Sequence, residues 1–142
     1  MVFSKIFVNE KIEKIKEYLA GVKHLFRFSA QEIITDSEKL HVAERLFQLI
    51  VDEIIDINQH FIKELGLNVP DDFEGTFNIL AKNKILPDDF ALKIAPTVGL
   101  RNRLVHRYEE LNPKLFIESF QKEYPDFEKY IGLINAYSGQ NE

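Results

Sequence analysis

Apolar side chains recur at three- and four-residue steps along most of the chain, and this spacing places them on one face of an α-helix. A first series of this kind fills residues 5–28. A second series begins after the polar residues 35–37, which offer N-cap side chains, and it continues to Leu65. Gly66 follows, a residue type that ends many helices. The pattern therefore predicts two helices in the first half of the chain, of which the second is long.

Prolines divide the second half of the chain. Residues 73–82 carry the apolar side chains of a short third helix. A proline followed by two aspartates, at 87–89, predicts the start of a fourth helix, which Pro96 would bend. A last helical region is predicted from the Asn-Pro pair at 112–113, with a break or kink at Pro125.

The sequence pattern predicts no β-sheet. No segment alternates apolar and polar residues over the length of a strand, and there is no internal repeat or low-complexity linker. The length of 142 residues, 45% of them hydrophobic, is enough for one core. We therefore expect an all-α fold, an antiparallel up-and-down bundle of about five helices, in a single domain that covers residues 1–142.

Composition removes several classes of function. The 18 basic and 23 acidic residues give a formal charge of -5, which does not suit a protein that coats nucleic acid, so any RNA contact would be local. The absence of cysteine excludes disulfides, thiolate nucleophiles and the common zinc sites. No glycine-rich phosphate loop, GxSxG elbow or nucleotidyltransferase metal motif occurs. The N-terminal segment has no long apolar stretch, so we expect a cytoplasmic protein without a membrane anchor.

One segment, RNRLVHRY at residues 101–108, concentrates groups that can act on a phosphate. The guanidinium of Arg101 has a planar fork that suits phosphate oxygens, and His106 can exchange a proton near neutral pH. RNA cleavage needs such a pair, because a base activates the ribose 2'-hydroxyl while a cation stabilises the charge on the phosphate. A simpler explanation also exists, since basic side chains near a helix C-terminus favour the helix dipole.

Helical geometry limits how these residues can cooperate. Asn102 and His106 are four positions apart and share one face of a helix, whereas Arg101 and His106 are five apart. At ~100° per residue, Arg101 points about 140° away from His106. Either the helix ends between them, or two copies of the segment meet across a two-fold axis and line one cleft. We favour the second interpretation, which predicts a homodimer.

The segment also carries a family signature. Arg101, four residues, His106, one residue and Tyr108 form an Arg-x4-His-x-Tyr pattern, and with it the chain resembles the HepT-like toxins of the HEPN superfamily. The resemblance extends beyond the motif. Residues 43–62 resemble the long second helix of that family, and residues 77–113 resemble the segment that leads through its active site.

The resemblance implies a HEPN-like helical fold and a metal-independent endoribonuclease that needs no cofactor. By this comparison Arg101 and His106 are the catalytic pair, and Asn102 supports the site. Arg103 and Arg107 lie beside them in the sequence and are expected to bind RNA phosphates. No bound metal is expected.

The resemblance further implies a role as a toxin with a regulator. Members of the family pair with a minimal nucleotidyltransferase antitoxin that transfers AMP to the motif tyrosine, here Tyr108. A bulky, charged adduct beside the cleft would exclude RNA by steric hindrance and like-charge repulsion. Two alternatives stay open at this point: a catalytically inactive module that binds a nucleotide, RNA or a partner, and a purely structural dimerisation bundle.

Charged residues outside the motif give weaker signals. Asp52, Asp56 and His60 follow one another at four-residue steps, a spacing that can hold a metal or orient a catalytic imidazole through a carboxylate. Lys23 and Arg27, one turn apart, could extend a track for phosphates. In both cases a polar, solvated helix face with ordinary charge pairs is the simpler explanation.

Overall fold

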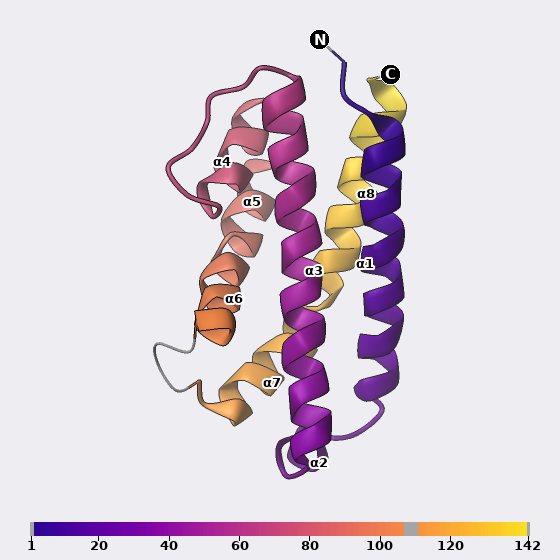
Figure 1. Ribbon diagram of the computed structural model, residues 1–142, viewed down its shortest axis with the longest axis vertical. Helices are drawn as coiled ribbons and strands as arrows, with labels where there is room; N and C mark the ends of the chain where they lie inside the picture. The colour runs from indigo at the N-terminus through magenta and orange to yellow at the C-terminus, as the bar shows by residue number, and fades with distance from the viewer. Residues whose placement is uncertain (1, 107–110, 142) are drawn as a thin grey trace.

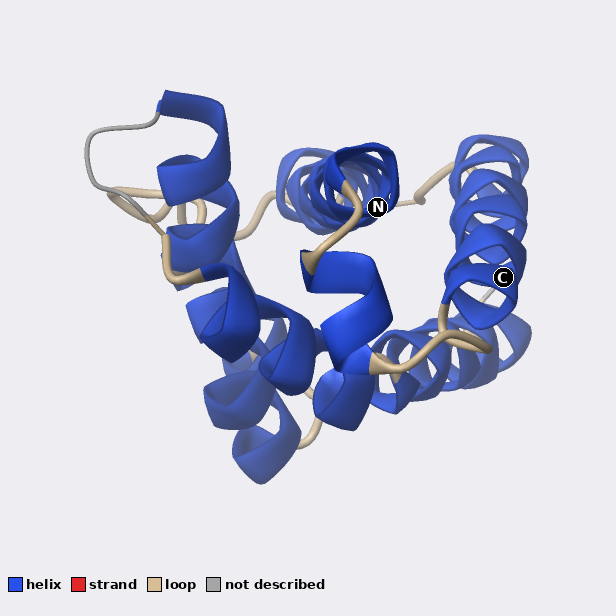
Figure 2. Ribbon diagram, turned by 90° about the horizontal axis from the view of Figure 1, so that it is seen from below, coloured by secondary structure: helices blue, strands red, loops and turns tan. Residues whose placement is uncertain are grey.

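The computed structural model describes residues 2–106 and 111–141, and all regular secondary structure in those ranges is helical (Figure 1, Figure 2). The all-α prediction is therefore confirmed. No helix in these ranges has the length and the hydrophobicity that spanning a membrane requires. The described residues form eight helices: α1 (Lys5–Leu25), α2 (Ala30–Ile34), α3 (Ser37–Glu64), α4 (Gly75–Lys82), α5 (Asp88–Ile94), α6 (Pro96–His106), α7 (Pro113–Glu123) and α8 (Pro125–Gln140).

The long helix α3 is the centre of the packing. It contacts α1 on one side and α4 and α6 on the other, and α8 lies against α1 (Figure 1). The helix α7 crosses near the end of the molecule where α2 lies, and these two helices contact each other. This arrangement brings α6, which carries most of the candidate motif, against α3.

The sequence of α3 explains this central position. Its apolar residues recur at helical spacing and are buried against the neighbouring helices: Ala43, Phe47, Ile50, Ile54, Ile57 and Phe61. The predicted end at Gly66 is confirmed, because Gly66 has φ 65° and the N–H of Leu67 donates to the carbonyl of Ile62 at 2.9 Å. Glycine adopts this left-handed backbone without the steric cost that a Cβ brings.

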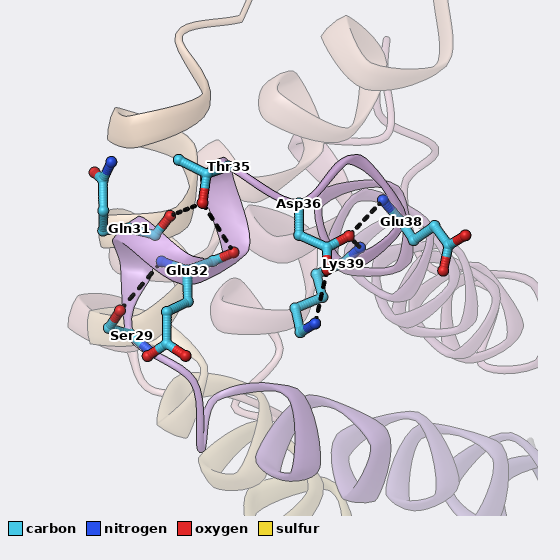
Figure 3. A network of polar contacts seen from close by, with 7 residues as sticks. All are labelled: Ser29, Gln31, Glu32, Thr35, Asp36, Glu38 and Lys39. Carbon is cyan, nitrogen blue, oxygen red and sulfur yellow. Dashed lines mark hydrogen bonds and ion pairs between the residues drawn. The ribbon is translucent and has the colours of Figure 1, made fainter.

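Capping side chains determine where α2 and α3 begin (Figure 3). Ser29 accepts a hydrogen bond from the N–H of Glu32, whose carboxylate accepts from the N–H of Ser29, a complete capping box. Asp36 caps α3 by accepting from the N–H groups of Glu38 and Lys39. The Lys39 ammonium donates to the same carboxylate at 2.8 Å and lowers the pKa of Asp36. The ionised Asp36 side chain stabilises the folded protein fully above the ordinary Asp pKa. This stabilisation is lost as the pH falls through the lowered pKa of Asp36.

Prolines and a short helix make the number of helices larger than the five that we expected. The predicted bend at Pro96 is a break, with α5 ending at Ile94 and Pro96 beginning α6, because proline has no N–H for the helical ladder. Pro125 begins α8 directly after α7 in the same way, as the predicted break at this position required. The five residues of α2 were not predicted as a helix, since so short a segment cannot show a helical period.

A buried polar network joins α3, α4 and α8 inside the core. The Tyr130 hydroxyl donates to Oδ1 of Asn58 at 2.6 Å, and Nδ2 of Asn58 donates to Oγ1 of Thr76 at 3.0 Å. The Thr76 hydroxyl in turn donates to the carbonyl of Phe73 at 2.6 Å. All three side chains of the network are buried, and burial raises the pKa of Tyr130 well above its ordinary value. The network therefore stays uncharged and hydrogen-bonded.

Removing the hydroxyl of Tyr130 is expected to destabilise the protein. Tyr130→Phe leaves Oδ1 of Asn58 buried without its donor, and an unsatisfied buried polar group costs about 1–3 kcal/mol. The free energy of unfolding from urea titration measures the effect. Tyr137→Phe on the same helix is the matched control, because among the described residues no hydrogen bond from its hydroxyl is present. Equal stability of the two variants would contradict the role given to the network.

Candidate active site on helix α6

Helix α6 holds both residues of the predicted catalytic pair. It begins at Pro96 and continues through His106, so Arg101 and His106 lie on one uninterrupted helix. The first of the two geometric alternatives, a helix that ends between them, therefore does not occur. Because the two positions differ by about 140° around the helix axis, their side chains leave it in different directions.

Arg101 points inward to α3. Its Nε donates to Oδ1 of Asp52 at 2.6 Å, and its Nη1 donates to Oδ1 of Asn102 at 3.0 Å. The side chains of Arg101 and Asp52 keep 19% and 31% of their accessible surface. The guanidinium is therefore held by two oxygen atoms at a partly solvated position.

The other residues of the motif differ in their exposure to solvent. Asn102 is half-buried, while Arg103 and His106 are exposed. Asn102 and His106 are one turn apart on α6, which confirms that they share a face. Arg107 and Tyr108, the predicted phosphate-binding and modified residues, lie outside the described residues.

The polar residues that follow one another at four-residue steps on α3, Asp52, Asp56 and His60, bind different partners. Asp52 binds Arg101, whereas Asp56 binds the ammonium of Lys11 at 2.8 Å. Nε2 of His60 accepts a hydrogen bond from the N–H of Ser4, its ring stacks on Phe7, and burial lowers its pKa. Within the described ranges no cluster of three or more His, Cys, Asp or Glu side chains could hold a metal ion. The carboxylate of Asp52 thus orients an arginine, which the sequence did not suggest.

The basic residues near the end of α1 do not extend the motif. Lys23 forms an ion pair with Glu128 at 3.2 Å, and Nη2 of Arg27 contacts Nε2 of His24 at 3.1 Å. Helix α3 lies between α1 and α6 (Figure 1). A track for phosphates that joins these residues to Arg101 is therefore absent from the described part of the chain, and the solvated helix face is the better explanation.

Comparison with protein families identifies the family of this chain. The model of the family described as "Ribonuclease HepT-like" matches residues 8–134. The chain belongs to the HepT-like ribonuclease family. The residues matched include all of α6 and the contact between Arg101 and Asp52.

Two curated relatives of this HepT-like protein are nucleases. A tRNA nuclease HepT of Aphanizomenon flos-aquae is 32% identical over 132 residues, which cover 93% of this chain and 90% of the relative. An mRNA nuclease HepT of Shewanella oneidensis is 29% identical over 135 residues, which cover 92% of this chain and 97% of the relative. The similarity therefore extends along nearly the whole of each protein.

Solved structures share the fold of this HepT-like protein. A tri-AMPylated HEPN toxin of Shewanella oneidensis, in complex with an MNT antitoxin, has a TM-score of 0.86 at 26% identity. The match covers 94% of this chain and 99% of the solved chain. A toxin–antitoxin structure with AMP-PNP has a TM-score of 0.85 at 25% identity, with coverages of 93% and 99%. The HEPN-like helical arrangement expected from the motif is thereby confirmed.

Proposed function

We propose that this HepT-like protein is the toxin of a toxin–antitoxin pair and acts as a metal-independent endoribonuclease. The observation that carries the proposal is the guanidinium of Arg101, which Asp52 and Asn102 fix on the same helix as His106, in a chain of a ribonuclease family. We also propose that residues 1–142 form one domain and that the protein works in the cytoplasm.

Each residue of the site has a chemical task in this mechanism. His106 acts as general acid or base on the ribose 2'-hydroxyl or on the leaving 5'-oxygen. Arg101 stabilises the negative charge that develops on the phosphate oxygens, and Asn102 keeps the guanidinium in position. Attack by the 2'-hydroxyl on the adjacent phosphorus breaks the bond to the 5'-oxygen and leaves a cyclic phosphate. Arg103 and Arg107 bind neighbouring phosphates.

A homodimer completes the site. Because Arg101 and His106 leave one helix in different directions, a single copy cannot aim both at the same phosphate. Two copies of α6 facing each other across a two-fold axis bring Arg101 of one copy near His106 of the other. The dimer is thus part of the proposed chemistry.

The antitoxin partner is a nucleotidyltransferase that transfers AMP to Tyr108. The tri-AMPylated toxin of Shewanella oneidensis in complex with its MNT antitoxin supports this assignment, since it shares the fold over nearly the whole chain. The adduct adds negative charge beside the RNA site and thereby repels the substrate. Mass analysis of Tyr108 after incubation with the cognate antitoxin and ATP tests the modification.

RNA degradation by the purified, unmodified protein tests the proposed function. We expect cleavage of tRNA or mRNA fragments in the presence of a metal chelator, with products that end in a cyclic phosphate. An unmodified protein that binds RNA but cleaves none would instead indicate an inactive binding module. A protein that neither binds nor cleaves RNA would indicate a structural dimerisation bundle. Loss of cleavage on chelation would contradict the metal-independent mechanism.

A further inference from the structure

The ion pair between Asp52 and Arg101 joins two helices that are far apart in the sequence. Asp52 lies in the middle of α3, where the neighbouring residues Val51 and Ile54 are buried in the core. Arg101 lies on α6, and its Nε is 2.6 Å from Oδ1 of Asp52. The carboxylate therefore comes from a rigid part of the fold, although the arginine that it binds belongs to a short helix.

The pair also determines which way the guanidinium faces. A guanidinium has five N–H donors in one plane. Asp52 accepts from Nε and Asn102 accepts from Nη1, so two contacts on different nitrogen atoms fix the rotation of the plane. These two contacts leave three N–H groups for other acceptors. An arginine held in this way loses less freedom when it meets a phosphate than an arginine that rotates in solvent.

The neighbouring carboxylates on α3 do not share this task. Glu53 and Asp56 both bind the ammonium of Lys11 on α1, at 3.2 and 2.8 Å. Asp56 lies one turn beyond Asp52 on the same helix and carries the same carboxylate group. It binds Lys11 and does not contact Arg101. Asp56 therefore provides a matched control.

We propose that Asp52 is a positioning residue of the ribonuclease site, which holds the Arg101 guanidinium across α3 and α6 so that it meets the scissile phosphate in one orientation. The proposal rests on the proposed function, because it assigns a role toward the phosphate that is cleaved. Asp52 itself need not touch the RNA. Its effect passes through Arg101 alone.

A double-mutant cycle tests this dependence. We expect Asp52→Ala to lower the single-turnover rate of RNA cleavage by ~10²-fold, since a small misplacement of a catalytic group has effects of that size. Asp52→Asn keeps an oxygen that can accept from Nε but loses the charge, so we expect it to lower the cleavage rate about tenfold. In an Arg101→Ala background, Asp52→Ala should cause no further loss. A further loss of similar size there would overturn the proposal, because it would indicate a role outside Arg101.

A spectroscopic measurement separates this proposal from the proposed function. The Nε–H signal of Arg101 in ¹⁵N NMR reports its hydrogen bond whether or not the protein cleaves RNA. We expect the signal to move in Asp52→Ala and to stay in place in Asp56→Asn, which should also keep wild-type cleavage. On addition of 2'-O-methyl RNA, which cannot be cleaved, the wild-type signal should change and the Asp52→Ala protein should bind more weakly or lose that change. If the wild-type protein shows both NMR effects but cleaves no RNA, the proposed ribonuclease function is contradicted and the role of Asp52 in holding Arg101 is not. An unchanged signal in Asp52→Ala would overturn the role of Asp52.

Discussion

His106→Ala is expected to lower the rate of RNA cleavage by ~10²- to 10⁴-fold, the usual contribution of a general acid or base. The imidazole is exposed at the end of α6, so its removal leaves no cavity in the core and the fold should persist. Rates measured on labelled tRNA and mRNA at constant protein concentration provide the test. Circular dichroism of the variant shows whether the helices are retained.

His41→Ala is the matched control for this experiment. His41 is also an exposed histidine on a helix, but it lies near the start of α3 and outside the motif. We expect it to cleave RNA at the wild-type rate. Equal cleavage by His106→Ala and wild type would exclude His106 from the chemistry and leave the helix-dipole explanation of the basic segment.

The helical elements could be predicted from local signals. Pro96 and Pro125 determine helix boundaries through their missing N–H, and Gly66 ends α3 in a left-handed backbone conformation that costs glycine less than a residue with a Cβ. These effects depend only on the residue and its immediate neighbours. The capping box of Ser29 and Glu32 is also local, but a helix of five residues gives no periodic pattern to accompany it.

The candidate site could be predicted only in part. The direction of Arg101 relative to His106 follows from the helical period alone, and the structure excludes a helix end between them because α6 continues to His106. The partner of Arg101 could not be predicted, since Asp52 is 49 positions away and meets it only after α6 packs on α3. The sequence showed Asp52, Asp56 and His60 as one polar stripe. In the folded chain the three side chains bind different partners: Asp52 contacts α6, Asp56 contacts α1, and His60 contacts the residues before α1.

The same geometry makes a strong prediction about assembly. A heterodimer of one Arg101→Ala chain and one His106→Ala chain should cleave RNA at roughly half the wild-type rate, because one of its two composite sites keeps both residues. Either variant alone, as a homodimer, should be nearly inactive. Co-expression with two different affinity tags and sequential purification gives the mixed dimer without the parent homodimers. The rate per dimer is then compared with that of a doubly tagged wild type.

The reciprocal heterodimer is the control that makes the result decisive. It combines a wild-type chain with a chain that carries both substitutions, so Arg101 and His106 survive only within one copy. If each phosphate needs residues from both copies, this heterodimer is inactive; if one copy suffices, it keeps about half of the activity and the first heterodimer has none. The two mixed dimers contain the same number of intact side chains in total, so their difference depends only on which chain carries them. An active reciprocal dimer would mean that α6 or the segment after it rearranges to bring Arg101 and His106 of one chain together.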